Sequence, residues 1–300
     1  MHPFAQIDPK HPVLIAGPTA SGKSALAMDI ARRFDSVIIN ADALQVYDCW
    51  RVLTARPGVE DTENVAHALY GTVGRTQEYS VGHWLRDVAR ILKITDRHAI
   101  IVGGTGLYLS SIVNGLADIP KVSHEVRKTC DTRFQLHGLA ALIKDLERVD
   151  RATLAGIDRQ NPARVRRAWE VYHGTGYGLA YWHKNQSKPL IMADKANLFV
   201  VEAPKDWLNT RIATRLNNMI AGGALDECRA ALSNWQPDLP SSQAIGAKSL
   251  ISYLNGEMTL DAATAAAALA TRQYAKRQRS WFRARMVNWQ TVNLSTDPSG

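Results

Sequence analysis

Gly17-Pro18-Thr19-Ala20-Ser21-Gly22-Lys23-Ser24 is the stretch of sequence that decides the fold. It has the spacing G-x-x-x-x-G-K-S of a phosphate-binding loop, or P-loop. Its glycines let backbone N–H groups wrap a phosphate chain at a helix N-terminus, Lys23 adds a positive charge, and the Ser24 hydroxyl can ligate Mg²⁺. The alternative is a glycine-rich turn without a ligand. The pattern favours a ligand with at least two phosphates, bound by residues 17–24.

The segments on either side of this loop have the periods of a strand and a helix. Residues 13–16 form an apolar, strand-like run, residues 24–34 place apolar side chains on one helical face, and residues 36–40 are again strand-like. A second helical pattern at 83–95 precedes a buried strand at 99–102. This alternation predicts an α/β, P-loop NTPase-like fold: a parallel sheet flanked by helices.

The pattern changes after Pro120, where strands disappear and Arg and Lys accumulate on helical segments. Asn161 followed by Pro162 is a helix start signal. Residues 174–189 are predicted to be a loop, residues 197–202 a strand that returns to the sheet, and Asp206 the cap of the next helix. The predicted division is a P-loop core at 1–119, an inserted helical domain at 120–195, and core completion at 196–300.

Charge and cysteine content bound the setting of the protein. The chain has 36 Lys and Arg against 28 Asp and Glu, a net charge of +8, which favours a polyanionic partner without requiring one. Three scattered cysteines fit a reducing cytoplasm better than a disulfide framework or a zinc site. Residues 1–11 contain no apolar run and no later stretch is long and apolar enough for a bilayer. We therefore expect a soluble, cytoplasmic protein without a membrane partner, and a monomer by default.

Asp42 is the candidate catalytic base. A P-loop ATPase usually has a carboxylate after a buried strand to help hold magnesium, but the strand at 99–102 ends in Gly103-Gly104-Thr105. Asp42 instead follows the strand at 36–40, at the sheet edge where α/β proteins bind ligands. A helix cap or a Mg²⁺ ligand remains an alternative role for this carboxylate.

A basic stripe lies on the C-terminal helical segment, between residues 269 and 286. It consists of Arg272, Lys276, Arg279 and Arg283, spaced by three or four residues. Such a stripe suits a phosphate backbone, which contributes salt-dependent affinity without sequence information. A solvated helix face that complements the helix dipole is the alternative.

Six motifs together resemble the tRNA dimethylallyltransferase family, whose members prenylate the adenosine beside the anticodon. The resemblance covers nearly the whole chain. The motifs are GPTASGKS from Gly17, NADALQVY from Asn40, TARP from Thr54, VGGTGLY from Val102, PARVRRAWEV from Pro162 and TRQYAKRQRSWFR from Thr271. Their spread over the core, the insertion and the last helix makes the resemblance far more specific than a P-loop alone.

The resemblance implies an activity and roles for individual residues. Dimethylallyl diphosphate would bind with its diphosphate on the P-loop, with Mg²⁺ as cofactor and no ATP hydrolysis. Asp42 would take the proton from the exocyclic amine of adenosine, while Thr19, Lys23 and Arg215 would stabilise the departing diphosphate. The tRNA anticodon arm would contact a larger set of residues, with the target adenosine flipped from its stack. These are Asp42, Ala43, Leu44, Gln45, Thr105, Arg127, Ala163, Arg164, Val165, Arg166 and Arg167.

Two departures from the family pattern, at Ala43 and at Asp48-Cys49-Trp50, and three rival functions stay open. Relatives commonly have Ser or Thr where this chain has Ala43, which puts one hydroxyl contact near the acceptor in doubt. Adenylate isopentenyltransferase shares the P-loop and the base but acts on a free nucleotide, so it has no need of a basic insertion. A small-molecule kinase would use ATP and a second acid after a strand. A non-enzymatic RNA-binding protein would leave the P-loop and Asp42 without a purpose.

Overall fold

The computed structural model of the chain describes residues 7–294. The chain divides into two compact units, Met1–Val113 with Leu190–Gly300, and Asn114–Pro189. The sequence-based expectation for residues 1–11 lies partly outside the described residues, which begin at residue 7. The predicted domain boundaries at residues 120 and 195 stay a prediction. A division into compact units does not show which segment of the chain binds tRNA. Within residues 7–294, no helix is long and apolar enough to cross a membrane.

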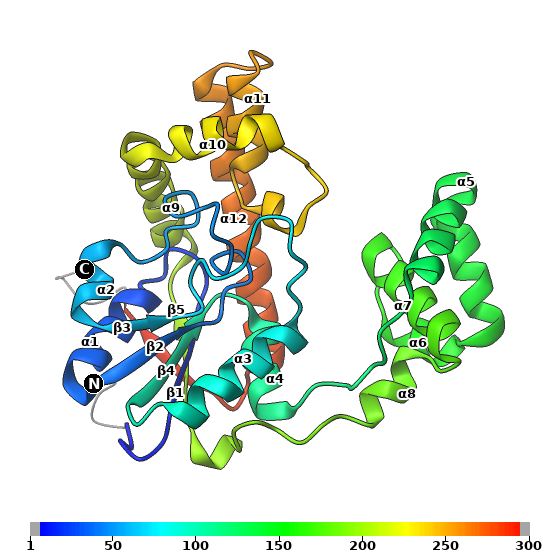
Figure 1. The fold of residues 1–300 in the computed structure, drawn as a ribbon, viewed down its shortest axis with the longest axis horizontal. Coiled ribbons are helices and arrows are strands. Elements are labelled where there is room, and N and C mark those ends of the chain that lie inside the picture. Colours follow the sequence, from blue (N-terminus) through cyan, green and yellow to red (C-terminus); the bar gives the residue numbers. More distant parts are fainter. Residues whose placement is uncertain (1–6, 295–300) are drawn as a thin grey trace. The chain divides into compact units, whose positions relative to one another are not determined.

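The first unit is built on a six-stranded sheet in the order β3-β2-β4-β1-β5-β6, with every neighbouring pair parallel (Figure 1). Its strands are β1 (Val13–Ala16), β2 (Ser36–Asn40), β3 (Ala66–Ala68), β4 (His98–Gly103), β5 (Asn197–Glu202) and β6 (Gln290–Asn293). The predicted α/β fold with a parallel sheet is confirmed. The edge strands β3 and β6 were not predicted, since three or four residues without strong alternation give little strand signal.

Alternation along the strands supplies two apolar faces of the sheet. Val13 and Ile15 pack against Leu26 and Ile30 of α1 (Lys23–Phe34). Leu14 belongs to a second cluster on the other face, together with side chains of α3 (Val81–Ile94), α4 (Gly106–Asn114) and the end of α12 (Leu260–Arg285). Because both faces are covered, the strands read as continuous apolar runs.

The remaining helices of this unit are α2 (Val59–Asn64), α9 (Lys205–Met219), α10 (Leu225–Ala231) and α11 (Ala247–Leu254). Pro204 occupies the N-cap position of α9, so the prediction that Asp206 caps this helix is wrong: Asp206 lies in the first turn. A carboxylate there still complements the positive end of the helix dipole. Gly223, with φ of 106°, sits in the irregular turn that joins α9 to α10.

The second unit consists of four helices, α5 (His124–Val149), α6 (Arg151–Gly156), α7 (Pro162–Thr175) and α8 (Leu179–Lys184). Asn161 caps α7 as predicted, because its side chain accepts a hydrogen bond from the Arg164 backbone. The prediction of a loop over 174–189 is wrong for α8. Buried Leu179 and half-buried Trp182 join the core of this unit, so tertiary packing orders a segment whose Gly and Lys content suggested a loop.

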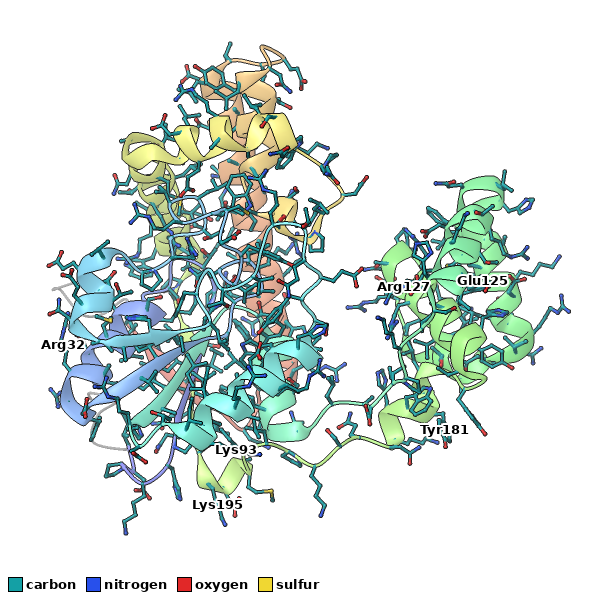
Figure 2. The ribbon with its side chains drawn as sticks, in the orientation of Figure 1. Arg32, Lys93, Glu125, Arg127, Tyr181 and Lys195 are labelled. Carbon is teal, nitrogen blue, oxygen red and sulfur yellow. The ribbon has the colours of Figure 1, made fainter. Side chains whose placement is uncertain are left out.

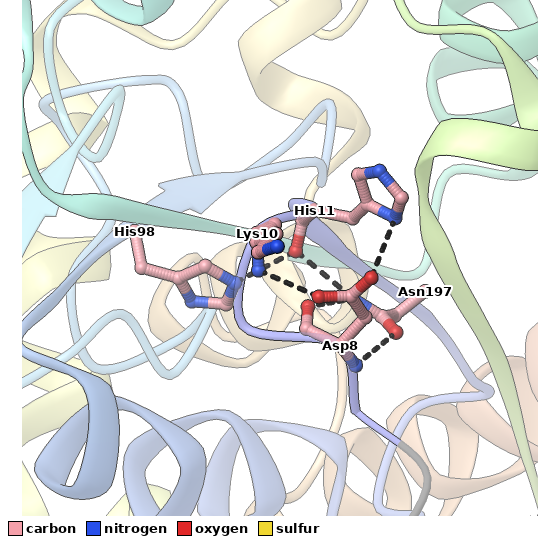
Figure 3. Close-up of polar contacts among 5 residues, drawn as sticks. All are labelled: Asp8, Lys10, His11, His98 and Asn197. Carbon is pink, nitrogen blue, oxygen red and sulfur yellow. Dashed lines mark hydrogen bonds and ion pairs between the residues drawn. The ribbon is translucent and has the colours of Figure 1, made fainter.

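The amino ends of β4 and β5 anchor the loop that precedes β1 (Figure 3). The Asn197 amide donates to the carbonyls of Asp8 and His11, each at 2.9 Å, and its oxygen accepts from the Asp8 backbone at 2.9 Å. His98 Nε2 lies 2.8 Å from the same His11 carbonyl, and the Lys10 backbone donates to the Asp8 carboxylate. Polar groups at this edge are satisfied by one another, whereas the functional motifs collect at the carboxyl edge.

Candidate active site

The P-loop connects β1 to α1 at the carboxyl edge of the sheet. Gly22, at the N-cap of α1, has a left-handed backbone with φ of 89°, and Ala20 has φ of 63°. A Cβ on Gly17 would lie 2.8 Å from Ser21 Oγ and 3.1 Å from Val201 Cβ, so only glycine fits there. The N–H groups at the start of α1 are therefore arranged for an anion. Buried Ser21 Oγ has no hydrogen-bond partner among the described residues.

Lys23 lies in the loop with its ammonium 3.3 Å from the Pro18 carbonyl. Burial lowers the pKa of Lys23 from 10.5 to about 8; Asp42 acts in the opposite direction, and Arg215 lowers it further. A desolvated cation with few compensating contacts is prepared to gain an anionic ligand, because the ligand restores the charge balance that burial removed.

Arg215 comes to this site from α9, far along the chain. Burial lowers the pKa of its guanidinium, Asp42 opposes this shift, and Arg211 adds to it. Arg211, one turn earlier, donates from Nε to the Ala20 carbonyl at 3.1 Å and stacks at 4.6 Å over the Trp207 ring. Arg211 therefore supports the P-loop directly, a role that was not predicted from the sequence.

Asp42 lies in a tight turn after β2. Its backbone N–H donates to the Asn40 side chain at 2.8 Å, and its Oδ1 accepts from the Leu44 backbone at 3.0 Å. Thr105 Oγ1 accepts from the Ala43 backbone at 2.9 Å, and the Thr105 backbone donates to the Ala41 carbonyl at 3.1 Å. These hydrogen bonds through Thr105 join the turn that carries Asp42 to the turn after β4. Within its own turn, Asp42 uses one carboxylate oxygen, Oδ1, to accept from the Leu44 backbone.

One pocket brings the predicted catalytic residues together. Its polar side chains include Thr19, Lys23, Ser24, Asp42 and Arg215. Its apolar walls include Leu44, Leu53, Ile212, Leu216, Met219 and Ile245, and α12 adds Thr271 and Tyr274. Because cationic side chains, P-loop residues and aliphatic side chains line one pocket, it suits a ligand that has an anionic head and an apolar tail.

Gln45 lines the same pocket, and its amide nitrogen already donates two hydrogen bonds within the protein. Its Nε2 donates to the carbonyls of Thr54 and Ala55, at 2.9 and 3.0 Å, and so holds the loop of the TARP motif. Glu227 of α10 holds the preceding residues, since its carboxylate accepts from the backbone N–H groups of 51, 52 and 53. The side chains of Gln45 and Glu227 thus hold the loop whose residues Leu53 and Thr54 line the pocket. Glu227 was not identified from the sequence.

The other predicted tRNA-binding residues belong to the helical unit. Arg127 lies on α5 beside Glu125 (Figure 2), and residues 163–167 form the first turns of α7. Ala163, Arg164 and Arg167 are exposed or partly exposed, whereas Arg166 forms an ion pair with Asp131 and stacks 5.3 Å over Phe134. Val165 is fully buried in the core of this unit, so its side chain packs and does not face a ligand.

The basic stripe of α12 lines a groove with the start of α9. Arg272, Lys276, Arg279 and Arg283 all face it, and α9 contributes Lys205 and Asn209, which were not predicted from the sequence. Among the residues that the structure describes, no carboxylate lines the groove. The stripe therefore forms one side of a concave, cationic surface.

The chemistry of a metal at the P-loop follows from its donors. Ser24 and Asp42 supply a hydroxyl and a carboxylate to one pocket, both hard oxygen ligands of the kind Mg²⁺ prefers. Across residues 7–294, no group of three His, Cys, Asp or Glu side chains could hold a metal ion. A cation at the P-loop would need its other ligands from phosphate and water, which is the usual arrangement for Mg²⁺.

A family model and relatives of known name both match this chain, and they point to the same family of enzymes. Residues 45–285 match the model of the IPP transferase family. The chain is 53% identical over 294 residues to a tRNA dimethylallyltransferase of Cereibacter sphaeroides, covering 98% of this chain and all of the relative. It is 55% identical over 288 residues to one from Ruegeria sp., covering 96% and 97% of the two chains.

Solved structures also resemble this one. The tRNA isopentenylpyrophosphate transferase of Bacillus halodurans matches with a TM-score of 0.68 and 28% identity, over 97% of this chain and 92% of that one. A eukaryotic dimethylallyltransferase that acts on tRNA matches with a TM-score of 0.78 over 95% of this chain and 74% of that one; at 24% identity this likeness concerns the fold. The match to the family model over residues 45–285 and the relatives that are 53% and 55% identical over nearly their whole length show that the chain belongs to the IPP transferase family.

Proposed function

We propose that this protein transfers the dimethylallyl group of dimethylallyl diphosphate to the exocyclic amine of the adenosine 3′ to the anticodon in tRNA, releasing diphosphate. The observation that carries the proposal is the pocket in which P-loop, Lys23 and Arg215 adjoin aliphatic walls and Asp42. A diphosphate ester with a short isoprenoid tail matches both the charged and the aliphatic side chains that line this pocket. The relatives named above carry the same activity in their names.

In the proposed reaction, the exocyclic nitrogen forms a bond to the allylic carbon while the bond from that carbon to the diphosphate oxygen breaks. The proton lost by nitrogen goes to the Asp42 carboxylate, which the Leu44 backbone orients through Oδ1. Negative charge grows on the departing diphosphate, where P-loop N–H groups, Thr19, Lys23 and Arg215 stabilise it.

Mg²⁺ is the cofactor that the donor set fits, with the Ser24 hydroxyl as the protein ligand that would hold it and diphosphate oxygens and water as its other ligands. When bound, the ion neutralises part of the diphosphate charge. We further propose that the enzyme works as a monomer in the cytoplasm, that the anticodon arm of tRNA contacts residues 42–45, Thr105, Arg127 and exposed residues of 163–167, and that the groove of α9 and α12 binds tRNA phosphates.

The lowered pKa of Lys23 leads us to expect that the binding of dimethylallyl diphosphate depends on pH. Its pKa of about 8 means that the ammonium loses its proton as the pH rises from 7 to 9, whereas the phosphates are already ionised. The affinity for dimethylallyl diphosphate should therefore fall up to about tenfold per pH unit above 8, as measured by calorimetry from pH 6.5 to 9.5. In Lys23→Arg, where the guanidinium keeps its charge, the affinity should not change over this range. A flat profile for the unmodified protein would contradict the prediction.

Because cationic side chains of α12 and α9 line the groove, we expect them to contribute to the salt dependence of tRNA binding. Changing Arg272, Lys276 and Arg279 to Gln should weaken tRNA binding and reduce the slope of log affinity against log salt by about 1 for each phosphate that is no longer neutralised. The control is Arg32→Gln, Lys93→Gln and Lys195→Gln, which removes the same charge from residues outside the groove (Figure 2). Filter binding from 50 to 300 mM salt measures both slopes. Equal slopes for the two triple variants would mean that the stripe faces solvent.

The direct test is transfer of radiolabel from dimethylallyl diphosphate, with Mg²⁺ and without ATP, to unmodified tRNA and, in parallel, to AMP. Label in tRNA alone is expected. Label in AMP would assign the chain to the free-nucleotide enzymes instead. No transfer to either acceptor would refute prenyl transfer and leave ATP-dependent phosphate transfer as the activity to test.

A further inference from the structure

Gln278 is a buried polar residue on α12, and it lies between the two turns that carry the proposed chemistry. Its side chain is 5% exposed. Oε1 accepts a hydrogen bond from the Thr19 backbone at 2.9 Å, and Nε2 donates to the Gly104 carbonyl at 2.9 Å. The donor on one side and the acceptor on the other leave a single possible orientation of the amide.

These two bonds complete a connection from the P-loop to Asp42. Gly104 precedes Thr105, whose hydroxyl holds the Ala43 backbone directly after Asp42. A Cβ on Gly104 would lie 2.2 Å from Gln278 Nε2, so this position must be glycine for the amide to approach. Tyr274, one turn before Gln278, interacts with the side chains of both Thr105 and Gln278. The face of α12 opposite its basic stripe thus contacts both halves of the pocket.

We propose that Gln278 is a positioning residue that holds the diphosphate-binding loop at the correct separation from the Asp42 turn. The inference rests on the proposed function. A neutral amide offers, in one rigid planar group, both the acceptor that the Thr19 backbone needs and the donor that the Gly104 carbonyl needs, whereas an ionised carboxylate offers only acceptors. Because misplacement of reacting groups by about 1 Å can cost about 100-fold in rate, a change at Gln278 should act on turnover.

Two substitutions separate the hydrogen bonds from packing. Gln278→Met keeps similar volume and removes both bonds, so kcat per folded molecule should fall at least about tenfold at every pH, with the Kd for tRNA changed less than about twofold. Gln278→Glu retains both bonds while its acid is protonated, because the carbonyl accepts and the hydroxyl donates. Ionisation removes the donor and sets two oxygens against each other. Its kcat relative to the unmodified enzyme should therefore fall with rising pH.

The experiment measures kcat and KM of all three proteins from pH 5.5 to 9, with folded fractions from circular dichroism. Gln236→Glu, at an exposed amide outside the pocket, is the control and should match the unmodified enzyme. A merely structural Gln278 would lower the melting temperature and leave kcat per folded molecule and its pH profile unchanged, which would overturn the proposal. A pH-independent ratio for Gln278→Glu would overturn it as well. Absence of transfer by the unmodified enzyme would instead refute the proposed function.

Discussion

Asp42→Ala is expected to lower the turnover of tRNA prenylation by about 100-fold or more, as for loss of a general base, while tRNA binding stays nearly intact. The substitution removes the carboxylate that lines the pocket, so the attacking nitrogen no longer has a positioned group to take its proton. Single-turnover transfer of radiolabel measures the chemical step, and filter binding measures the affinity for tRNA.

Asp42→Asn tests the role of Asp42 as a general base separately from its role in holding the turn after β2. Its amide oxygen still accepts from the Leu44 backbone, so the turn should persist while the base is removed, and turnover should fall as far as in Asp42→Ala. Asp48→Asn makes the same chemical change at an exposed position six residues later and should leave turnover unchanged. Full turnover by Asp42→Asn would remove the base role and leave this residue as a cap or metal ligand.

Arg215→Ala is expected to lower kcat by about 100-fold to 1,000-fold, with a smaller rise in KM for dimethylallyl diphosphate. Negative charge concentrates on the diphosphate as its bond to carbon breaks, so a partly buried guanidinium in the pocket stabilises the transition state more than the bound substrate. Arg215→Lys should recover only part of the rate, because an ammonium lacks the planar fork that matches phosphate oxygens. Steady-state kinetics with saturating tRNA measures both parameters.

Stability distinguishes this effect from misfolding. Burial disfavours the charge on Arg215, so its removal should not reduce the melting temperature. Arg229→Ala, on α10, removes an exposed arginine paired with Asp226 and should leave kcat unchanged. If Arg215→Ala kept its kcat within about threefold, transition-state stabilisation of the diphosphate would rest on the P-loop and Lys23 instead.

Several elements were predictable because their signals are local. Strands β1, β2 and β5 have the predicted bounds, since continuous apolar runs mark strands buried on both faces. The start of α7 follows from Asn161 and Pro162, which act on the first turn of their own helix. Helix α8 and the cap of α9 were mispredicted, because packing of Leu179 and the placement of Pro204 outweighed local propensity.

The amino-acid sequence by itself determined the phosphate-binding loop, the α/β fold, the acid after β2 and the family resemblance, because each depends on contiguous residues or on motifs in a fixed order. Only the tertiary structure decided which distant side chains meet. It brings Arg215 beside Lys23, pairs the α12 stripe with α9, buries Val165, and sets Gln278 between Thr19 and Gly104. The physical reason is that such contacts depend on how helices pack across a sheet, which spacing along the chain does not specify.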